Sequence, residues 1–90
     1  METETEDLRI LRNKIDEIDK QIISLLDERM SVCREIGKIK KLNKIKITDK
    51  KREMEILSRA GDFKGIYKEI IDICKKAQGG YDEVWYIWVL

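Results

Sequence analysis

The stretch LRILRNKIDEIDKQIISLLDERMSVCREIGKIKKL, residues 8–42, decides the fold. Its apolar residues recur every three or four positions, with one gap of seven between Leu25 and Val32, and form an apolar stripe: Leu8, Leu11, Ile15, Ile18, Ile22, Leu25, Val32, Ile36 and Ile39. This spacing places the stripe on one side of an α-helix, and the chain contains no proline that would interrupt it. We therefore expect an amphipathic helix from about Asp7 to about Leu42, roughly 54 Å long at about 1.5 Å per residue.

Two shorter helices are predicted after this stretch. The segment NKIKIT, residues 43–48, is expected to be a loop, and Thr48 or Asp49 can cap a helix from Lys50 to about Ala60. Gly61 is a suitable stop for that helix.

Asp62 can then cap a third helix that ends near Gln78, before two glycines. Its inward face is expected to hold Phe63, Tyr67, Ile70, Ile71, Cys74 and Ala77. The predicted fold class is all-α, with one long and two short helices. Residues 1–78 are expected to form this helical domain, and residues 79–90 an aromatic C-terminal tail to which we assign no role.

The long helix is too long for the short ones to cover. At about 18 Å and about 26 Å, the two short helices would leave much of the apolar stripe in water. Soluble monomers rarely expose apolar patches of that size. We therefore expect an intertwined homodimeric helical bundle.

The composition of the chain narrows the possible classes of function. The chain has 90 residues, a net charge of +1 and no histidine, which removes the usual general base and the commonest zinc ligand. We expect no cofactor and no metal.

The start METETED resembles no targeting signal, and no apolar run approaches the length of a membrane span, so a cytoplasmic location is expected. The lysine-rich segment, residues 38–52, has no interleaved aromatic residues that would indicate nucleic-acid binding.

The two cysteines, Cys33 and Cys74, are far apart in the sequence and form no C-x-x-C motif. In a chain of intracellular appearance, this pattern favours two free, buried thiols over a disulfide or a metal site.

Arg29 interrupts the apolar stripe with a charge. Lys40 follows 11 residues later, close to the same helix face, so both side chains can reach one small molecule. Arg12 is turned about 100° away, so it cannot easily serve the same site within one chain but could serve the equivalent site of a partner. Taken alone, Arg29 is better explained as a charge that sets helix register, as in a noncatalytic dimerisation module.

The shorter helices also carry polar residues toward their apolar faces. Arg52 and Glu53 precede the apolar residues of the second helix by one turn, and Gln78 extends the inward face of the third. Buried charges are unfavourable without partners, so three helices with such exceptions suggest a shared ligand. Arginine forks favour carboxylates, and the balance of charges suits a small dianion.

The segments LRNKIDEIDKQIISLLDERMSVCREIGKIK and ITDKKRE resemble the all-helical class of chorismate mutases. The shared patterns are L-R-x-x-I-D-x-I-D, L-L-x-x-R, G-x-x-K and D-x-x-R-E, and the resemblance covers about residues 8–78. It implies a homodimer that converts chorismate to prephenate, a pericyclic reaction without proton transfer or cofactor. A pyruvate lyase acting on isochorismate is the alternative on the same fold.

The resemblance also implies roles for the site residues. Arg12 would hold a substrate carboxylate in the partner's site, and Arg29 would hold one in its own. Lys40 would contact the ether oxygen and a carboxylate, and Arg52 would support that end of the site.

Glu53 and the region of Asp49 would receive the ring hydroxyl group. Gln78 would donate a hydrogen bond to the ether oxygen. Cys74 falls where the family often has a serine near a carboxylate.

Overall fold

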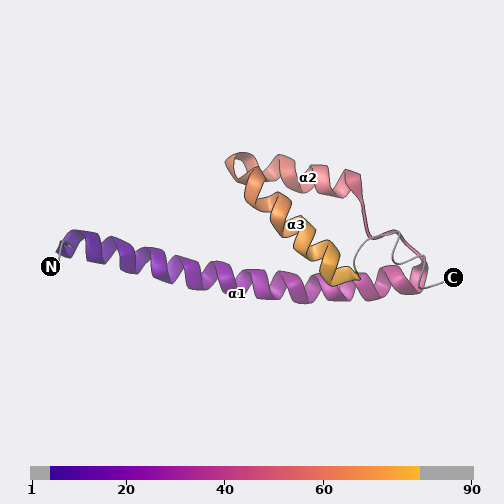
Figure 1. Cartoon of the computed structure of the whole chain (residues 1–90), viewed down its shortest axis with the longest axis horizontal. Coiled ribbons are helices and arrows are strands. Elements are labelled where there is room, and N and C mark those ends of the chain that lie inside the picture. Colours follow the sequence, from indigo (N-terminus) through magenta and orange to yellow (C-terminus); the bar gives the residue numbers. More distant parts are fainter. Residues whose placement is uncertain (1–4, 80–90) are drawn as a thin grey trace.

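A computed structural model describes residues 5–79. The chain forms α1 (Glu6–Asn43), α2 (Lys50–Ala60), a short 3₁₀ turn η1 (Gly61–Phe63) and α3 (Lys64–Gln78) (Figure 1). Every element in this range is helical, which confirms the predicted all-α fold. Most of the predicted tail, residues 80–90, lies outside the described residues.

The long helix α1 begins and ends on local signals. The Thr5 hydroxyl accepts a hydrogen bond from the Leu8 N–H at 3.1 Å, and Glu6 and Asp7 place negative charge at the positive end of the helix dipole. The last residue of the helix is Asn43, and its C-cap Lys44 adopts a left-handed conformation with φ 56°. The apolar period therefore predicted the helix bounds to within one residue at each end.

The start of α2 confirms one predicted cap, and the start of α3 contradicts another. The Asp49 Oδ1 accepts from the Arg52 N–H at 3.0 Å. Asp62 caps nothing, because it lies inside η1, which continues directly into α3 without a side-chain cap. A capping carboxylate needs an extended residue before the helix, and here the chain is already turning.

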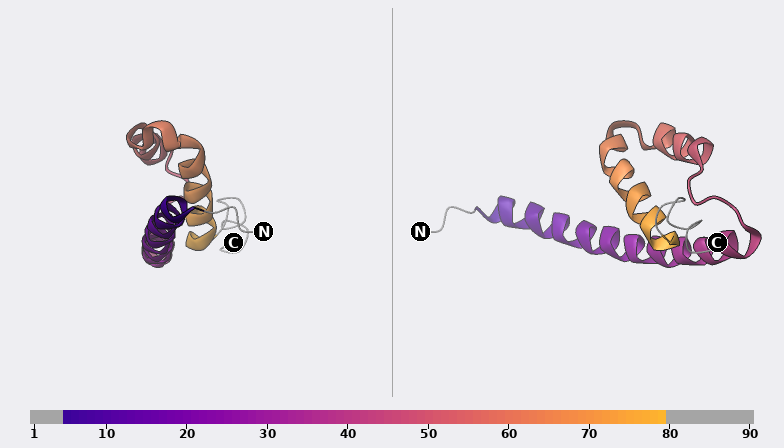
Figure 2. Two further views of the ribbon diagram at one scale, coloured as in Figure 1. Left: turned by 90° about the vertical axis from the view of Figure 1, so that its left-hand side faces the viewer. Right: turned by 45° about the vertical axis from the view of Figure 1, so that its right-hand side comes forward.

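The helices form an open triangle, in which α3 connects α2 to α1. It runs back from the end of α2 to α1 and packs against both (Figure 1). Among residues 5–79, no Cα atom of α1 lies within 8 Å of one in α2. The N-terminal half of α1 extends alone beyond this triangle, as Figure 2 shows, and the molecule measures 62 × 23 × 21 Å.

The core of the described chain is small. Its buried apolar residues are Cys33, Ile47, Ile71 and Cys74. The apolar stripe of α1 is exposed, with Ile15 56% and Leu25 62% accessible. Phe63, predicted to face inward, is 61% exposed, because η1 lies at the far corner of the triangle from α1.

Cys33 and Cys74 form a disulfide between α1 and α3, with their Cα atoms 5.4 Å apart. The expectation of free thiols was wrong. Sequence spacing gave no indication that α3 folds back to bring the two residues face to face. Residues 5–79 contain no free cysteine.

Gly37 allows α3 to approach α1 closely. A Cβ atom at this position would lie 2.6 Å from the Gln78 Cα, well inside van der Waals contact. The glycine lowers the helix propensity of α1 by about 1 kcal/mol, but it leaves room for the C-terminal turn of α3. None of the helices between residues 5 and 79 combines the length and apolar character needed to cross a bilayer.

Candidate functional site

A cavity of about 330 Å³ opens between α1, α2 and α3. Its lining combines apolar side chains with charged and polar ones contributed by all three helices. The predicted site residues that line it are Arg29, Lys40, Asp49, Arg52, Glu53, Cys74 and Gln78. The triangle of helices thus brings together residues that are up to 49 positions apart in the sequence, Arg29 and Gln78 being the extremes.

Two cations come from α1. Arg29 is half-buried, and its Nη1 lies 3.7 Å from the Cys33 Sγ. The Lys40 Nζ donates to the carbonyl oxygen of Ile47 at 2.7 Å. Because Ile47 is only 5% exposed, this bond ties the ammonium group to a fixed point of the loop between α1 and α2.

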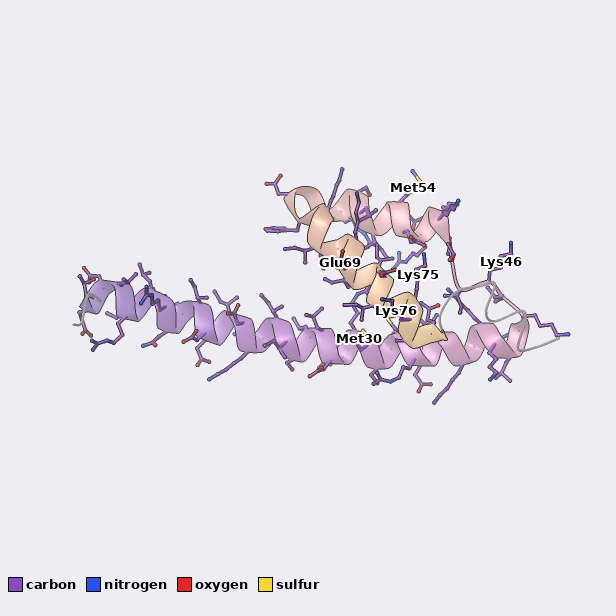
Figure 3. All side chains as sticks on the ribbon, viewed as in Figure 1. Met30, Lys46, Met54, Glu69, Lys75 and Lys76 are labelled. Atoms are coloured by element: carbon purple, nitrogen blue, oxygen red, sulfur yellow. A yellow bond between two sulfur atoms is a disulfide. The ribbon has the colours of Figure 1, made fainter. Side chains whose placement is uncertain are left out.

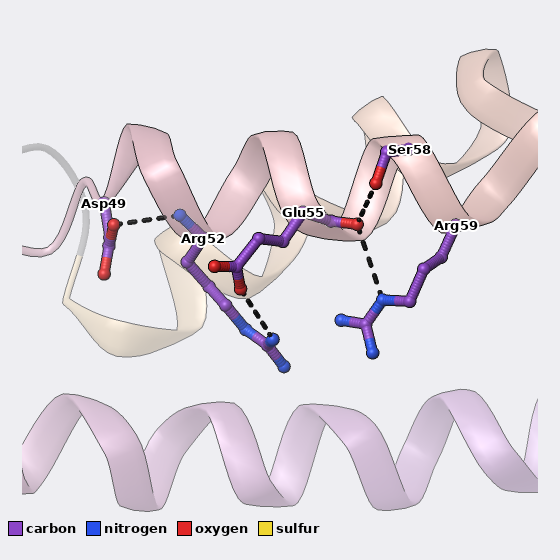
Figure 4. Close-up of polar contacts among 5 residues, drawn as sticks. All are labelled: Asp49, Arg52, Glu55, Ser58 and Arg59. Atoms are coloured by element: carbon purple, nitrogen blue, oxygen red, sulfur yellow. Dashed lines mark hydrogen bonds and ion pairs between the residues drawn. The ribbon is translucent and has the colours of Figure 1, made fainter.

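The first turn of α2 supplies Arg52 and Asp49. Arg52 Nη1 lies 3.3 Å from the Glu55 Oε2 in a solvent-exposed ion pair. Figure 4 shows this pair and the Asp49 cap, with the guanidinium group of Arg52 on the side of α2 toward α1. Exposed pairs of this kind contribute about 1 kcal/mol or less, so a ligand anion can compete for the guanidinium.

Glu53 pairs with Lys75, a cavity residue that the sequence reading missed. The Lys75 Nζ lies 3.5 Å from the Glu53 Oε2, and their side chains are 20% and 27% exposed. Figure 3 shows Lys75 on α3 beneath α2, whereas Met54 points away from both α1 and α3. A signal was present, because Ile71, Lys75 and Gln78 are spaced by four and three and share a helix face.

The Glu53 carboxylate and the Gln78 amide each hold a buried oxygen. Glu53 Oε2 and Gln78 Oε1 have no hydrogen-bond partner among residues 5–79, although Oε2 is within ion-pair distance of Lys75. The Gln78 Nε2 donates to the Cys74 Sγ at 3.2 Å. Sulfur is a weak acceptor, so this bond is readily exchanged for one to an oxygen.

The disulfide changes what Cys74 offers the cavity. A thiol would be a weak donor, but a disulfide sulfur has no hydrogen to donate. The oxidised chain therefore lacks at position 74 the hydrogen bond that a serine would give.

Arg12 does not reach this cavity within one chain. It lies on the exposed N-terminal half of α1, about 25 Å along the helix axis from Arg29. The predicted site therefore divides into a cluster on one chain and an arginine that is remote from it.

The cavity carries a net positive charge. Its cations are Arg29, Lys40, Arg52 and Lys75, and its anions are Asp49 and Glu53. Such a surplus in a partly enclosed, largely apolar cavity favours a small anion with carboxylate or phosphate groups. Residues 5–79 contain no group of three or more His, Cys, Asp or Glu side chains placed to hold a metal ion.

Comparison with protein families and curated proteins finds a family model and several relatives that resemble this chain. A family model described as chorismate mutase type II matches residues 11–79. A chorismate mutase from Methanocaldococcus jannaschii is 38% identical over 71 residues, which are 79% of this chain and 62% of that protein. A bifunctional chorismate mutase/prephenate dehydratase from Aquifex aeolicus is 36% identical over 83 residues, with 77% of this chain and 23% of that protein covered.

A third relative has a different name. A 3-dehydroquinate dehydratase from Pyrobaculum aerophilum is 41% identical over 71 residues, covering 79% of this chain and 24% of that protein. The chain thus spans 62% or less of the length of these curated relatives.

Among solved structures, a conserved hypothetical protein from Pyrococcus furiosus superposes with a TM-score of 0.82 at 47% identity. The match covers 83% of this chain and 99% of that one.

Proposed function

Because this chain belongs to the chorismate mutase type II family, we propose that it catalyses the rearrangement of chorismate to prephenate, a step in phenylalanine and tyrosine biosynthesis. The observation that carries the proposal is the cavity between the helices, where Arg29, Lys40 and Arg52 surround apolar walls. Chorismate is a small dianion with one ring hydroxyl group, and the cavity offers cations for its carboxylates and Glu53 for its hydroxyl.

The reaction suits a site without an acid–base pair. One carbon–oxygen bond breaks while one carbon–carbon bond forms, and no proton is transferred. The site then has two tasks, to hold the flexible substrate in its compact reactive shape and to stabilise the charge that develops on the ether oxygen. The absence of histidine from the chain is compatible with both tasks.

Lys40 and Gln78 are the proposed catalytic donors to the ether oxygen. The Lys40 Nζ lines the cavity, held by its hydrogen bond to Ile47, and within residues 5–79 the Gln78 Nε2 donates to the Cys74 sulfur, a weak acceptor. Arg29 is the proposed anchor for one substrate carboxylate, with Arg52 supporting Lys40's end of the site. Glu53, with Asp49 nearby, is the proposed acceptor for the ring hydroxyl.

The proposed assembly is a homodimer with two shared sites. The exposed apolar stripe of α1 supports it, since burial of residues such as Ile15 and Leu25 requires a second surface. Arg12 would then enter the partner's cavity and bind a substrate carboxylate.

The proposed location of the enzyme is the cytoplasm. A disulfide is unusual there except in hyperthermophiles, whose intracellular proteins are often disulfide-rich.

The decisive experiment is to incubate the purified protein with chorismate and identify the product. We expect prephenate, formed without added metal or cofactor. Pyruvate and salicylate formed from isochorismate, with no prephenate from chorismate, would establish the lyase alternative.

No turnover of either substrate would leave a noncatalytic dimerisation module. In that case, Arg29→Leu would increase dimer stability by completing the apolar stripe. For the enzyme, we expect the same substitution to abolish most of the activity.

A further inference from the structure

The Cys33–Cys74 disulfide lies in the wall of the cavity and touches two of its functional side chains. Arg29 Nη1 lies 3.7 Å from the Cys33 Sγ, and Gln78 Nε2 donates to the Cys74 Sγ at 3.2 Å. The bond therefore joins two points that each contact a proposed substrate-binding group, one on α1 and the other on α3.

Few buried apolar side chains hold α3 against α1, although the two helices pack against each other. The buried apolar residues of the described chain are the two cysteines, Ile47 and Ile71. The C-terminal turn of α3 rests on Gly37, which offers no side chain to hold it. A core of this size leaves the crossing of the two helices weakly determined without a covalent link.

We propose that the disulfide is the positioning element of the site: it sets Gln78 on α3 against Arg29 and Lys40 on α1, so that the oxidised chain is the catalytically competent form. This inference rests on the proposed mutase function. Residues on different helices must be held within about 0.5 Å of the productive geometry, because small misplacements reduce turnover strongly. The four-residue spacing from Cys74 to Gln78 makes the link direct, because it places the glutamine one helical turn beyond the bond.

The disulfide can be reduced by a dithiol reductant. Its two thiols would transfer two electrons and two protons, so that the S–S bond becomes two thiols and the reductant becomes a disulfide. The cysteines are only 2% and 9% exposed, so attack requires α3 to separate from α1. We therefore expect the folded protein to resist a dithiol concentration that reduces the unfolded chain readily.

The test compares kcat and KM of the oxidised wild-type protein, the same protein reduced under denaturing conditions and refolded, and the re-oxidised sample. Circular dichroism is used to choose an assay temperature at which all three samples retain their helical content. We expect reduction to lower kcat by about tenfold or more with a smaller change in KM, and re-oxidation to restore it. A Cys33→Ser/Cys74→Ala variant, which adds no hydroxyl group at position 74, should resemble the reduced protein and be insensitive to reductant.

Several results would overturn the proposal. Thiol titration that finds two free cysteines in the purified protein would remove its basis. Equal kcat in oxidised and reduced protein would show that the bond only stabilises the fold, as would reduced samples that lose their helices at every temperature. An oxidised protein without activity on chorismate would instead refute the proposed function, and the positioning role with it.

If the serine variant fails to fold, Cys33→Val/Cys74→Ala provides a second test, because its apolar side chains fill the wall without a bond. Low kcat with native helix content in that variant supports the proposal. Wild-type kcat contradicts it.

Discussion

Lys40 shows how one residue is prepared for its proposed role. A lysine near the end of an exposed helix would ordinarily extend into water. Here its Nζ is held at 2.7 Å from the Ile47 carbonyl and lines the cavity. This fixed position removes part of the side-chain entropy that would otherwise be lost when the substrate binds.

Replacement of Lys40 by alanine is expected to lower kcat by about 10²- to 10³-fold, the usual effect of removing one donor to a developing oxyanion. Steady-state kinetics on chorismate, with circular dichroism as a check on folding, measures it. Lys38→Ala is a matched control, since Lys38 lies on the same helix and makes only an exposed ion pair with Glu35. Equal losses in the two variants would contradict the assignment of Lys40.

At the scale of elements, the decisive contact is the one between α1 and the end of α3. Gln78 lines the cavity because α3 approaches α1 at Gly37, where even a methyl group would collide with the Gln78 backbone. The glycine therefore links helix packing to the position of a proposed catalytic donor.

Gly37→Ala is expected to destabilise the fold by about 1–3 kcal/mol through overpacking, despite the higher helix propensity of alanine. Thermal unfolding would then begin several degrees lower, and kcat would fall because Gln78 is displaced. The control is Gly65→Ala in α3, where an added Cβ meets no other atom within 4 Å. We expect that variant to gain up to about 1 kcal/mol. A Gly37→Ala variant as stable as wild type would show that α3 does not rest on this position.

The whole molecule is too extended to be stable on its core alone. It is 62 Å long, and its apolar stripe is exposed along α1. The disulfide closes a loop across a sequence separation of 41, which stabilises the folded state by about 4 kcal/mol in the chain-entropy account. The proposed dimer would supply the rest by burying the stripe.

Shared sites predict recovery of activity in mixed dimers. Arg12→Ala and Arg29→Ala dimers are each expected to be nearly inactive. After subunit exchange at equal concentrations, half of the dimers are mixed and each has one intact site, so about one quarter of wild-type activity should return. Activity on chorismate after mixing measures this.

The control mixture combines Arg29→Ala with Lys40→Ala, which both belong to the same chain's cavity. No mixed dimer then has an intact site, so no recovery is expected. If Arg12→Ala and Arg29→Ala form heterodimers without regaining activity, Arg12 does not act across the interface.

The sequence alone determined the helices and much of the cavity lining. Helix bounds depend on apolar spacing and on local signals such as Asp49, and these act over a few residues. Charges on apolar faces, Arg29 above all, identified candidate residues because a buried charge requires a partner.

Only the tertiary structure decided the remaining features. The disulfide, the contact at Gly37 and the pairing of Lys75 with Glu53 all depend on where α3 crosses the other helices. That crossing depends on the disulfide and on packing between residues distant in the chain, which no local pattern encodes. Arg29 thus indicated the cavity from the sequence, whereas the position of α3 decided which other side chains line it.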